Sequence, residues 1–456
     1  MITSSPREDK AMKVIFPDAQ QMKDLGYAKL AYVPFLIGAD GDYPVEANRY
    51  LRERACLEWR PSLPGKHGSY RFNTRQTVAS LDAMARRLME FLLWCNNSTP
   101  SICWKDVVYL DDLIDKWQVG MLNGSASRSR KKLAIETINA RVAEACYFLS
   151  WAAERGYRDE FFVMASKVSL HGRFSKSGSG SRESRVGELV SRRRFLSLPS
   201  DVVLARWHSN LKVRYGEVLA LFAECLMRTG LRISEGTKFR SQDLPEKKYG
   251  PEGNGWREDW LQSGEVPCTI YMGVKGPKIA RGSDKSSKPR VIYLPIELAD
   301  RMDHYRREGR PTLISRWVSA GKSKDERDKR LKSTKTDVFW LGKRGKPLSN
   351  SWVRQTWSSG ATTPWRWCPH MARHLFAVNT LVSYMRDLIA QFKFSTIPSV
   401  GWLHGLMAGQ ISIILTPLMG HMSEETTLLY LRAAKERLII EFQHPTLRWL
   451  DDCDSR

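Results

Sequence analysis

The chain has 456 residues, and 42% of them are hydrophobic, so it is too long for one ordinary domain and too apolar to be disordered. Lysine and arginine number 72 against 49 aspartate and glutamate, which gives a net charge of +23. Such an excess repels itself in a compact fold unless a polyanion neutralises it. DNA or RNA is therefore the first partner to consider, with a merely solvated basic surface as the alternative.

Cysteine usage and apolar runs bound the cellular setting. The eight cysteines are scattered, and none has Cys-x-x-Cys spacing, so we expect reduced thiols in a cytoplasmic protein and no zinc site. Residues 1–10 contain no apolar signal core. Residues 394–420 lack charged side chains over a length that could span a bilayer, but prolines, glycines and His404 interrupt them. Buried core is the reading that we prefer for this stretch, and no membrane partner is expected.

The first half of the chain predicts a small helical domain. Residues 1–70 contain a helix-like stretch at 45–59 and indicate no particular role. Within 71–165, apolar residues at helical spacing predict helices at 81–95, 111–119 and 135–153, with a basic segment at 125–132. This all-α domain is either an ordinary bundle or a clamp on DNA. Residues 166–195 are rich in Ser, Gly and Arg, which predicts a flexible basic linker between two lobes.

The second lobe, residues 196–445, is predicted to be mainly α with a small antiparallel β-sheet. Helices are expected at 215–228, from 233, and at 297–308, 350–358, 369–385, 409–418 and 423–441. Strands at 268–274 and 290–295 form a hairpin, and 338–341 is a further short strand. The basic segment near 310–336 and the apolar segment near 386–407 read as insertions, and 446–456 is a tail.

Three segments of the second lobe concentrate side chains that could handle a phosphate: Arg232 and Glu235; His370, Arg373 and His374; and His421 with Tyr430. Cleaving a DNA backbone without a metal needs a nucleophile, cations on the non-bridging oxygens and an acid for the leaving oxygen. Arginine forks suit the second task, a tyrosine phenol the first, and a lysine among other cations the third. Singly, each residue has a structural reading, such as a packed tyrosine or an arginine–glutamate pair. Their coincidence in order and spacing favours the chemical reading.

In these segments the second lobe resembles the tyrosine recombinase or integrase family, whose catalytic domain is shared with type IB topoisomerases. The resemblance covers residues 200–440, and His421 and Tyr430 have the nine-residue spacing that the family uses. Ala372 stands where the family usually has leucine. The 36 positions from Arg373 to Gly409 exceed the family's usual distance, which is why an insertion near 386–407 is expected.

The resemblance implies a role for each residue. Tyr430 would be the nucleophile that forms a 3′-phosphotyrosyl link, and Arg232 and Arg373 would clamp the phosphate. His370 and His421 would be donors or proton handlers at the same phosphate, while Glu235 would brace the site and His374 would be structural. Lys275 best fits the general acid, and the competing loop lysines are Lys278, Lys285 and Lys288.

The resemblance also implies partners. Two lobes would form a C-shaped clamp on double-stranded DNA, and a protein that is a monomer or dimer when free would act on DNA as a homotetramer, without a cofactor. A mobile genetic element and accessory recombination proteins are the expected context, in bacterial cytoplasm near the nucleoid. The alternatives are a type IB topoisomerase-like relaxing enzyme and a catalytically inactive sequence-specific DNA-binding protein. The separate helical lobe and Gly420-His421 favour the recombinase.

Overall fold

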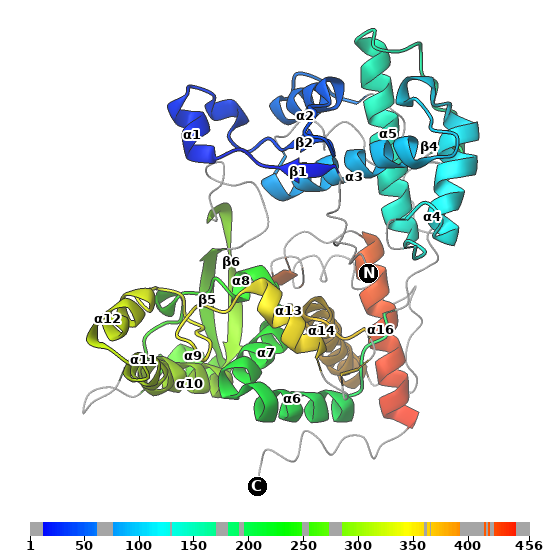
Figure 1. Cartoon of the computed structure of the whole chain (residues 1–456). Helices are drawn as coiled ribbons and strands as arrows, with labels where there is room; N and C mark the ends of the chain where they lie inside the picture. The colour runs from blue at the N-terminus through cyan, green and yellow to red at the C-terminus, as the bar shows by residue number, and fades with distance from the viewer. Residues whose placement is uncertain are drawn as a thin grey trace, which may run out of the picture. The chain divides into compact units, whose positions relative to one another are not determined.

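The computed structural model describes residues 12–61, 76–127, 130–169, 181–190, 196–248, 255–272, 285–359, 363–364, 366–392, 415, 418–419 and 424–443. The chain divides into two units, Met1–Arg193 and Arg194–Arg456 (Figure 1). Each unit has its own hydrophobic core. Within the described residues both units are mainly helical, and the strands form two-stranded antiparallel sheets. The expected fold class, mainly α with small antiparallel sheets, is confirmed.

The first unit is a helical bundle with two short sheets that the sequence did not predict. Its elements are β1 (Lys13–Ile15), α1 (Ala19–Asp24), a turn of helix at Ala28–Leu30, β2 (Phe35–Ile37), α2 (Val45–Cys56), α3 (Val78–Asn97), a turn at Trp104–Asp106, a helical segment at Tyr109–Gln118, α4 (Val119–Asn123), α5 (Ile135–Glu154), β3 (Ala165–Ser169) and β4 (Ser181–Arg185). In the first sheet β1 pairs with β2, with Val14 opposite Leu36. Helices α2, α3 and α5 pack on one another and bury one continuous core.

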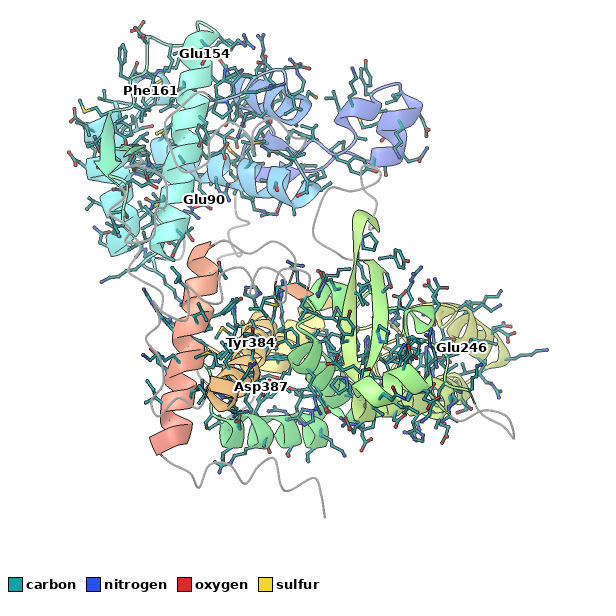
Figure 2. The ribbon with its side chains drawn as sticks, turned by 180° about the vertical axis from the view of Figure 1, so that it is seen from behind. Glu90, Glu154, Phe161, Glu246, Tyr384 and Asp387 are labelled. Atoms are coloured by element: carbon teal, nitrogen blue, oxygen red, sulfur yellow. The ribbon has the colours of Figure 1, made fainter. Side chains whose placement is uncertain are left out.

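Helix α2 belongs to this core, so residues 12–61 are part of the helical unit and not a separate region. The buried Glu53 carboxylate accepts from the indole of Trp151 at 2.9 Å and from Arg155 at 2.9 and 3.0 Å. The Tyr50 hydroxyl donates to Glu144 of α5 at 2.6 Å. Glu154, at the end of α5 (Figure 2), accepts a hydrogen bond from the indole N–H of Trp59, which follows α2 in the chain. The expected boundary at 70/71 is therefore not a structural boundary, because polar contacts across it hold the two segments together.

The expected flexible linker over 166–195 is wrong for the residues of it that the structure describes. Strands β3 and β4 pair in register, with Lys167 opposite Glu183. After β4 the backbone is bonded to the helices: Val186 accepts from Tyr109, Gly187 from Gln118 at 2.9 Å, and Leu189 from Asn139 at 2.8 Å. The Ser/Gly/Arg composition conceals these bonds because they use the backbone of 186–189 and not its side chains. Residues 170–180 and 191–195 lie outside the described part.

The second unit, Arg194–Arg456, is an α+β domain. Its elements are α6 (Asp201–Tyr215), α7 (Glu217–Thr229), α8 (Ile233–Gly236), a turn at Ser241–Asp243, α9 (Glu258–Ser263), β5 (Glu265–Met272), β6 (Lys285–Pro295), α10 (Ile296–His304), a helical segment at Tyr305–Gly309, α11 (Arg310–Ser319), α12 (Lys324–Ser333), α13 (Asn350–Ser358), α14 (Pro369–Phe392) and α16 (Glu424–Gln443). Helices α6 and α9 were not predicted. The predicted hairpin and the helix at 350–358 are confirmed.

Of three further expectations, for residues 310–336, 338–341 and 386–407, two differ from the structure and one is covered by it only in part. The basic segment near 310–336 folds as the helices α11 and α12. Residues 338–341 form only isolated bridges, from Val338 to Arg240 and from Leu341 to Pro347, and not a strand. Of the expected insertion at 386–407, residues 386–392 continue α14, and the rest lies outside the described residues, as does most of the predicted helix at 409–418.

The arrangement that positions the site is a layer in which α14 packs against α7 and against α16 (Figure 1). Helix α7 ends at Gly230, whose φ of 62° lies in the left-handed region that favours glycine. A Cβ on Gly230 would collide with the ring of Phe376 on α14, so the two segments approach closely only because this residue has no side chain. The turn after Gly230 brings Arg232 toward α14.

Among the described residues, no helix combines the length and the apolarity needed to cross a membrane. The uncharged stretch 394–420 lies largely outside those residues, so its predicted burial stays a prediction.

Candidate active site

Arg232 and Glu235 form a tight pair at the start of α8. The Arg232 Nη1 donates to Glu235 Oε1 at 2.8 Å, and the backbone N–H of Arg232 donates to Oε2 at 2.8 Å. Glu235 is fully buried. Burial alone would raise the pKa of Glu235, but the charge and hydrogen bond of Arg290, and those of Arg232, hold that pKa below its usual value. The carboxylate is therefore ionised at neutral pH and fixes the direction of the Arg232 fork.

Arg373 meets Arg232 at a single oxygen atom. From α14, the buried Arg373 side chain donates through Nη1 to the carbonyl of Gly230 and through Nη2 to the carbonyl of Met419. The Arg232 Nη2 donates to the same Met419 oxygen at 3.2 Å. Two guanidinium groups 141 positions apart in the sequence thus converge on one acceptor. This is the geometry that clamping one phosphate oxygen from two sides requires.

The cluster carries a surplus of positive charge. Arg232 and Arg290 both pair with the carboxylate of Glu235, and Arg373 adds a third positive charge that is felt by the same group. Burial, and then repulsion by Arg232 and Arg290, lower the pKa of Arg373 to about 9. The guanidinium still carries its charge at neutral pH, and an anion next to it would relieve both the repulsion and the cost of burial. The site is therefore electrostatically suited to bind a phosphate.

Tyr430, the candidate nucleophile, lies on α16 with 2% of its surface exposed. Its hydroxyl is 2.8 Å from Nδ1 of His374, and its ring packs in a cluster with Leu431 and Leu438 against α14. Burial raises the pKa of Tyr430, although Arg373 and Arg232 act in the opposite direction. In this conformation the residue is a packed tyrosine with a protonated phenol, and attack on a phosphate requires that the hydroxyl become accessible.

The two histidines of α14 stand one turn apart, with ring centroids 4.5 Å apart and planes at 74°. His370 is exposed, while burial, the neighbouring His370 and Arg373 lower the pKa of His374 to about 4. His374 is therefore neutral at neutral pH. The sequence assigned it a structural role, and the structure makes it the residue in direct contact with the phenol.

Several predicted site residues cannot be placed in this geometry. His421, Lys275 and Lys278 lie outside the described residues. Lys285 and Lys288 belong to strand β6, but their side chains are not among those described. The identity of the general acid and the role of His421 remain predictions.

Arg290 is the residue that sequence reasoning missed. It lies in β6 and donates to Glu235 Oε2 at 2.7 Å, to the carbonyl of Gly230 at 3.5 Å and to the carbonyl of Leu418. The signal was present in the sequence. In the run from 290 to 294 the alternate residues Ile292 and Leu294 face the core, and strand periodicity places Arg290 on that same face.

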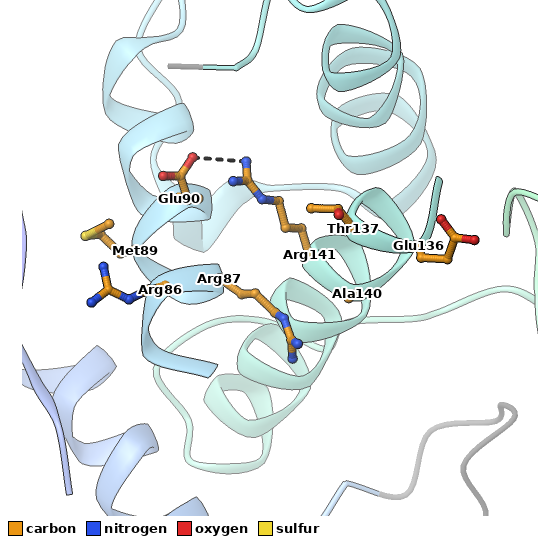
Figure 3. Close-up of a pocket in the computed structure, with 8 residues that line it drawn as sticks. All are labelled: Arg86, Arg87, Met89, Glu90, Glu136, Thr137, Ala140 and Arg141. Carbon is orange, nitrogen blue, oxygen red and sulfur yellow. Dashed lines mark ion pairs between the residues drawn. The ribbon is translucent and has the colours of Figure 1, made fainter. Parts of the chain in front are cut away.

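A concave surface lies between α3 and α5 of the first unit (Figure 3). Its lining includes Arg86, Arg87 and Arg141. Arg141 pairs with Glu90 at 3.0 Å inside the pocket. Arg86 pairs with Asp82 at 3.0 Å and Arg87 lies 3.9 Å from Glu144, yet the two side chains keep 60% and 40% of their surface exposed. Exposed arginines on a helical surface suit contacts to a phosphate backbone.

No family model matches the sequence, and no curated protein matches it. The chain is similar in structure to a XerH site-specific recombinase bound to a palindromic difH substrate, with a TM-score of 0.43 and 13% identity over 79% of this chain and 78% of that chain. It is similar to a Tn1549 transposon integrase in complex with transposon right end DNA, with a TM-score of 0.43 and 16% identity over 82% and 95% of the two chains. For a lambda integrase dimer bound to a core site the values are 0.39 and 12%, over 78% and 89%.

Proposed function

We propose that the chain is a site-specific DNA recombinase that cuts and rejoins double-stranded DNA through a 3′-phosphotyrosyl intermediate, without a metal ion. The observation that supports this most is the convergence of Arg232 and Arg373 on one oxygen atom. The second support is the hydrogen bond of the Tyr430 phenol to His374, the neighbour of Arg373 in the sequence. Both belong to one unit: the first supplies the two cations that phosphoryl transfer requires, and the second places the phenol beside the helix that carries Arg373.

In the proposed reaction a phosphate of the DNA takes the place of the Met419 carbonyl between the two arginines. The Tyr430 oxygen attacks phosphorus and loses its proton to a base, the bond from phosphorus to the 5′ oxygen breaks, and that oxygen takes a proton from an acid. The hairpin lysine, best fitted by Lys275, is the expected acid, and His370 and His421 are the expected proton handlers. The arginine charges stabilise the extra negative charge of the transition state. Attack by a 5′ hydroxyl on the phosphotyrosine reverses the steps and rejoins the strand.

The remaining features of the proposal concern partners. The net charge of +23 favours a polyanion, and the exposed arginines of the first unit are suited to backbone contacts. We propose that the protein acts on DNA as a homotetramer for a mobile genetic element, in the cytoplasm, with Glu235 bracing the site. The free protein is then a monomer or a dimer.

The decisive test traps the covalent complex. A duplex that the protein selects from a random-sequence pool is nicked near each candidate phosphate, so that a short fragment leaves and the adduct accumulates. Mass spectrometry of the adduct should find the phosphotyrosine at residue 430. Relaxation of any supercoiled plasmid without a specific site would support the topoisomerase instead. Tight binding of the selected duplex with no adduct at any nick would support the inactive DNA-binding protein.

A further inference from the structure

Arg290 lies on the buried face of β6, where the alternate residues along the strand have apolar side chains. Its alternate partners along the strand, Ile292 and Leu294, are 1% and 0% exposed, and Arg290 itself is 8% exposed. Burying a guanidinium is costly unless it is paired and hydrogen-bonded. An arginine at this position therefore depends on specific contacts, and those contacts identify what it does.

Two contacts of Arg290 go to groups that also hold a clamp arginine, and a third goes to the residue next to such a group. It bonds Oε2 of Glu235 at 2.7 Å, the oxygen that also accepts from the backbone N–H of Arg232, while the side chain of Arg232 bonds Oε1 at 2.8 Å. It shares the carbonyl of Gly230 with Arg373. It also bonds the carbonyl of Leu418, which precedes the Met419 carbonyl where Arg232 and Arg373 meet. The Arg290 guanidinium thus links Gly230 and Glu235 to the backbone of residues 418–419.

We infer that Arg290 is a positioning residue for the phosphate clamp. It saturates one oxygen of Glu235, so that the Nη2 group of Arg232 stays directed toward the position of the scissile phosphate. This inference rests on the proposed function. Without Arg290 the buried carboxylate would draw Arg232 into a two-pronged pair, because arginine and carboxylate forks match. The Nη2 that now points to the 419 carbonyl would turn away from the phosphate, although every residue that touches DNA would still be present.

The first experiment compares single-turnover formation of the tyrosyl adduct with binding, on the nicked duplex selected by the wild-type protein. Arg290→Met should lower the adduct rate by at least about tenfold, as loss of an oriented transition-state donor does, with binding changed less than about threefold. Arg290→Lys, which can pair with Glu235 but cannot reach all the carbonyls, should be intermediate. The control is Arg301→Met, since Arg301 also pairs with a carboxylate, Glu224, but on the surface of α10; its rate should equal that of the wild type.

A second readout separates positioning of the clamp from a general structural effect. A probe whose scissile linkage is a methylphosphonate carries no negative charge there, so the rate deficit of Arg290→Met should shrink on it. On a probe with sulfur in place of the leaving 5′ oxygen, which needs no acid, the deficit should persist. An equal deficit on the charged and the neutral probe, or a deficit abolished by the sulfur leaving group, would overturn the inference.

Folding of the variant needs its own control, because Arg290→Met leaves a buried carboxylate with one partner fewer. The double variant Glu235→Gln with Arg290→Met removes that charge as well and should regain thermal stability, while its adduct rate stays low because a neutral amide no longer fixes the direction of the Arg232 guanidinium. Recovery of both stability and rate would show that Arg290 only neutralises Glu235, and the inference would fail. A wild-type protein that forms no adduct on its selected duplex would overturn the proposed function together with this inference, whereas a normal wild type beside an equally fast Arg290→Met would overturn the inference alone.

Discussion

The hydroxyl of Tyr430 lies 2.8 Å from Nδ1 of His374, so the phenol and the imidazole are hydrogen-bonded across the interface of α16 and α14. Because both groups are largely buried, loss of either leaves the other without its partner. We expect Tyr430→Phe and His374→Ala each to lower the free energy of unfolding. The double variant should lose less than the sum of the two, with a coupling of about 1 kcal/mol. Urea unfolding of the four proteins measures this coupling, and strict additivity would mean that the bond contributes nothing.

Acid should destabilise the second unit partly through His374. Its pKa falls from an ordinary value of 6.5 in the unfolded chain to about 4 in the folded protein, because burial and the charges of His370 and Arg373 oppose protonation. Its contribution to stability is therefore complete above pH 6.5 and decreases as the pH falls toward 4, where the unfolded chain binds a proton and the folded protein does not. The free energy of unfolding of His374→Gln should depend less steeply on pH across that range. Identical pH profiles for the variant and the wild type would contradict this assignment.

Tyr430→Phe should bind the selected duplex as the wild type does and form no covalent adduct, because the ring still packs but the nucleophile is gone. Adduct on any other residue would refute the assignment of Tyr430.

Arg232→Ala and Arg373→Ala should each slow adduct formation by about 10²-fold or more, as loss of a transition-state donor does elsewhere. Single-turnover kinetics at saturating protein separates this effect from weaker binding. Arg257→Ala is the control, because Arg257 pairs with Asp259 on the surface of the same unit. A rate for Arg373→Ala within twofold of the wild type would mean that the convergence on Met419 has no role in the chemistry.

The pocket between α3 and α5 should contribute salt-sensitive affinity for DNA. Replacing Arg86 and Arg87 together with alanine should weaken binding to all duplex sequences, and the slope of log affinity against log salt should fall by about two. Lys116→Ala is a fair comparison, since Lys116 is an exposed, paired cation of the same unit outside the pocket. Fluorescence anisotropy at several salt concentrations gives both slopes. An unchanged slope for the double variant would exclude the pocket from the DNA interface.

The N-terminal residues should stabilise the first unit through Glu53. Glu53→Ala removes the acceptor of Trp151 and Arg155 and should cost about 2 kcal/mol of unfolding free energy, less than a fully buried pair because Arg155 is partly exposed. Glu58→Ala, at an exposed position just after the same helix, should have no measurable effect. Equal effects of the two substitutions would mean that α2 does not depend on its buried carboxylate.

Local patterns predicted most of the helices, because apolar spacing and the residues that end helices are short-range signals. The helix at 350–358 and the hairpin before α10 could be predicted in this way. The attachment of α2 to α5 could not, since it depends on Glu53 meeting Trp151 across 98 positions. The pairing of β3 with β4 was hidden by a composition typical of linkers.

The site divides along the same line. Arg232, Arg373 and Tyr430 could be proposed from motif spacing, whereas the meeting of two arginines at the carbonyl of Met419 is a tertiary relationship. Arg290 was overlooked because a single arginine in a strand reads as a surface residue until its alternation with Ile292 and Leu294 is considered. The contact of His374 with Tyr430 depends on how α14 and α16 pack, which no spacing encodes.

Gly230 makes the site sensitive to substitution at a residue that has no reactive side chain of its own. Its carbonyl anchors Arg373 and Arg290, and its missing side chain makes room for the ring of Phe376. A substitution by alanine would therefore keep the tyrosine and both clamp arginines and still inactivate the protein, because the added Cβ would force α7 and α14 apart. Natural copies that carry every expected reactive residue but another amino acid at 230 can be recognised from sequence as inactive remnants.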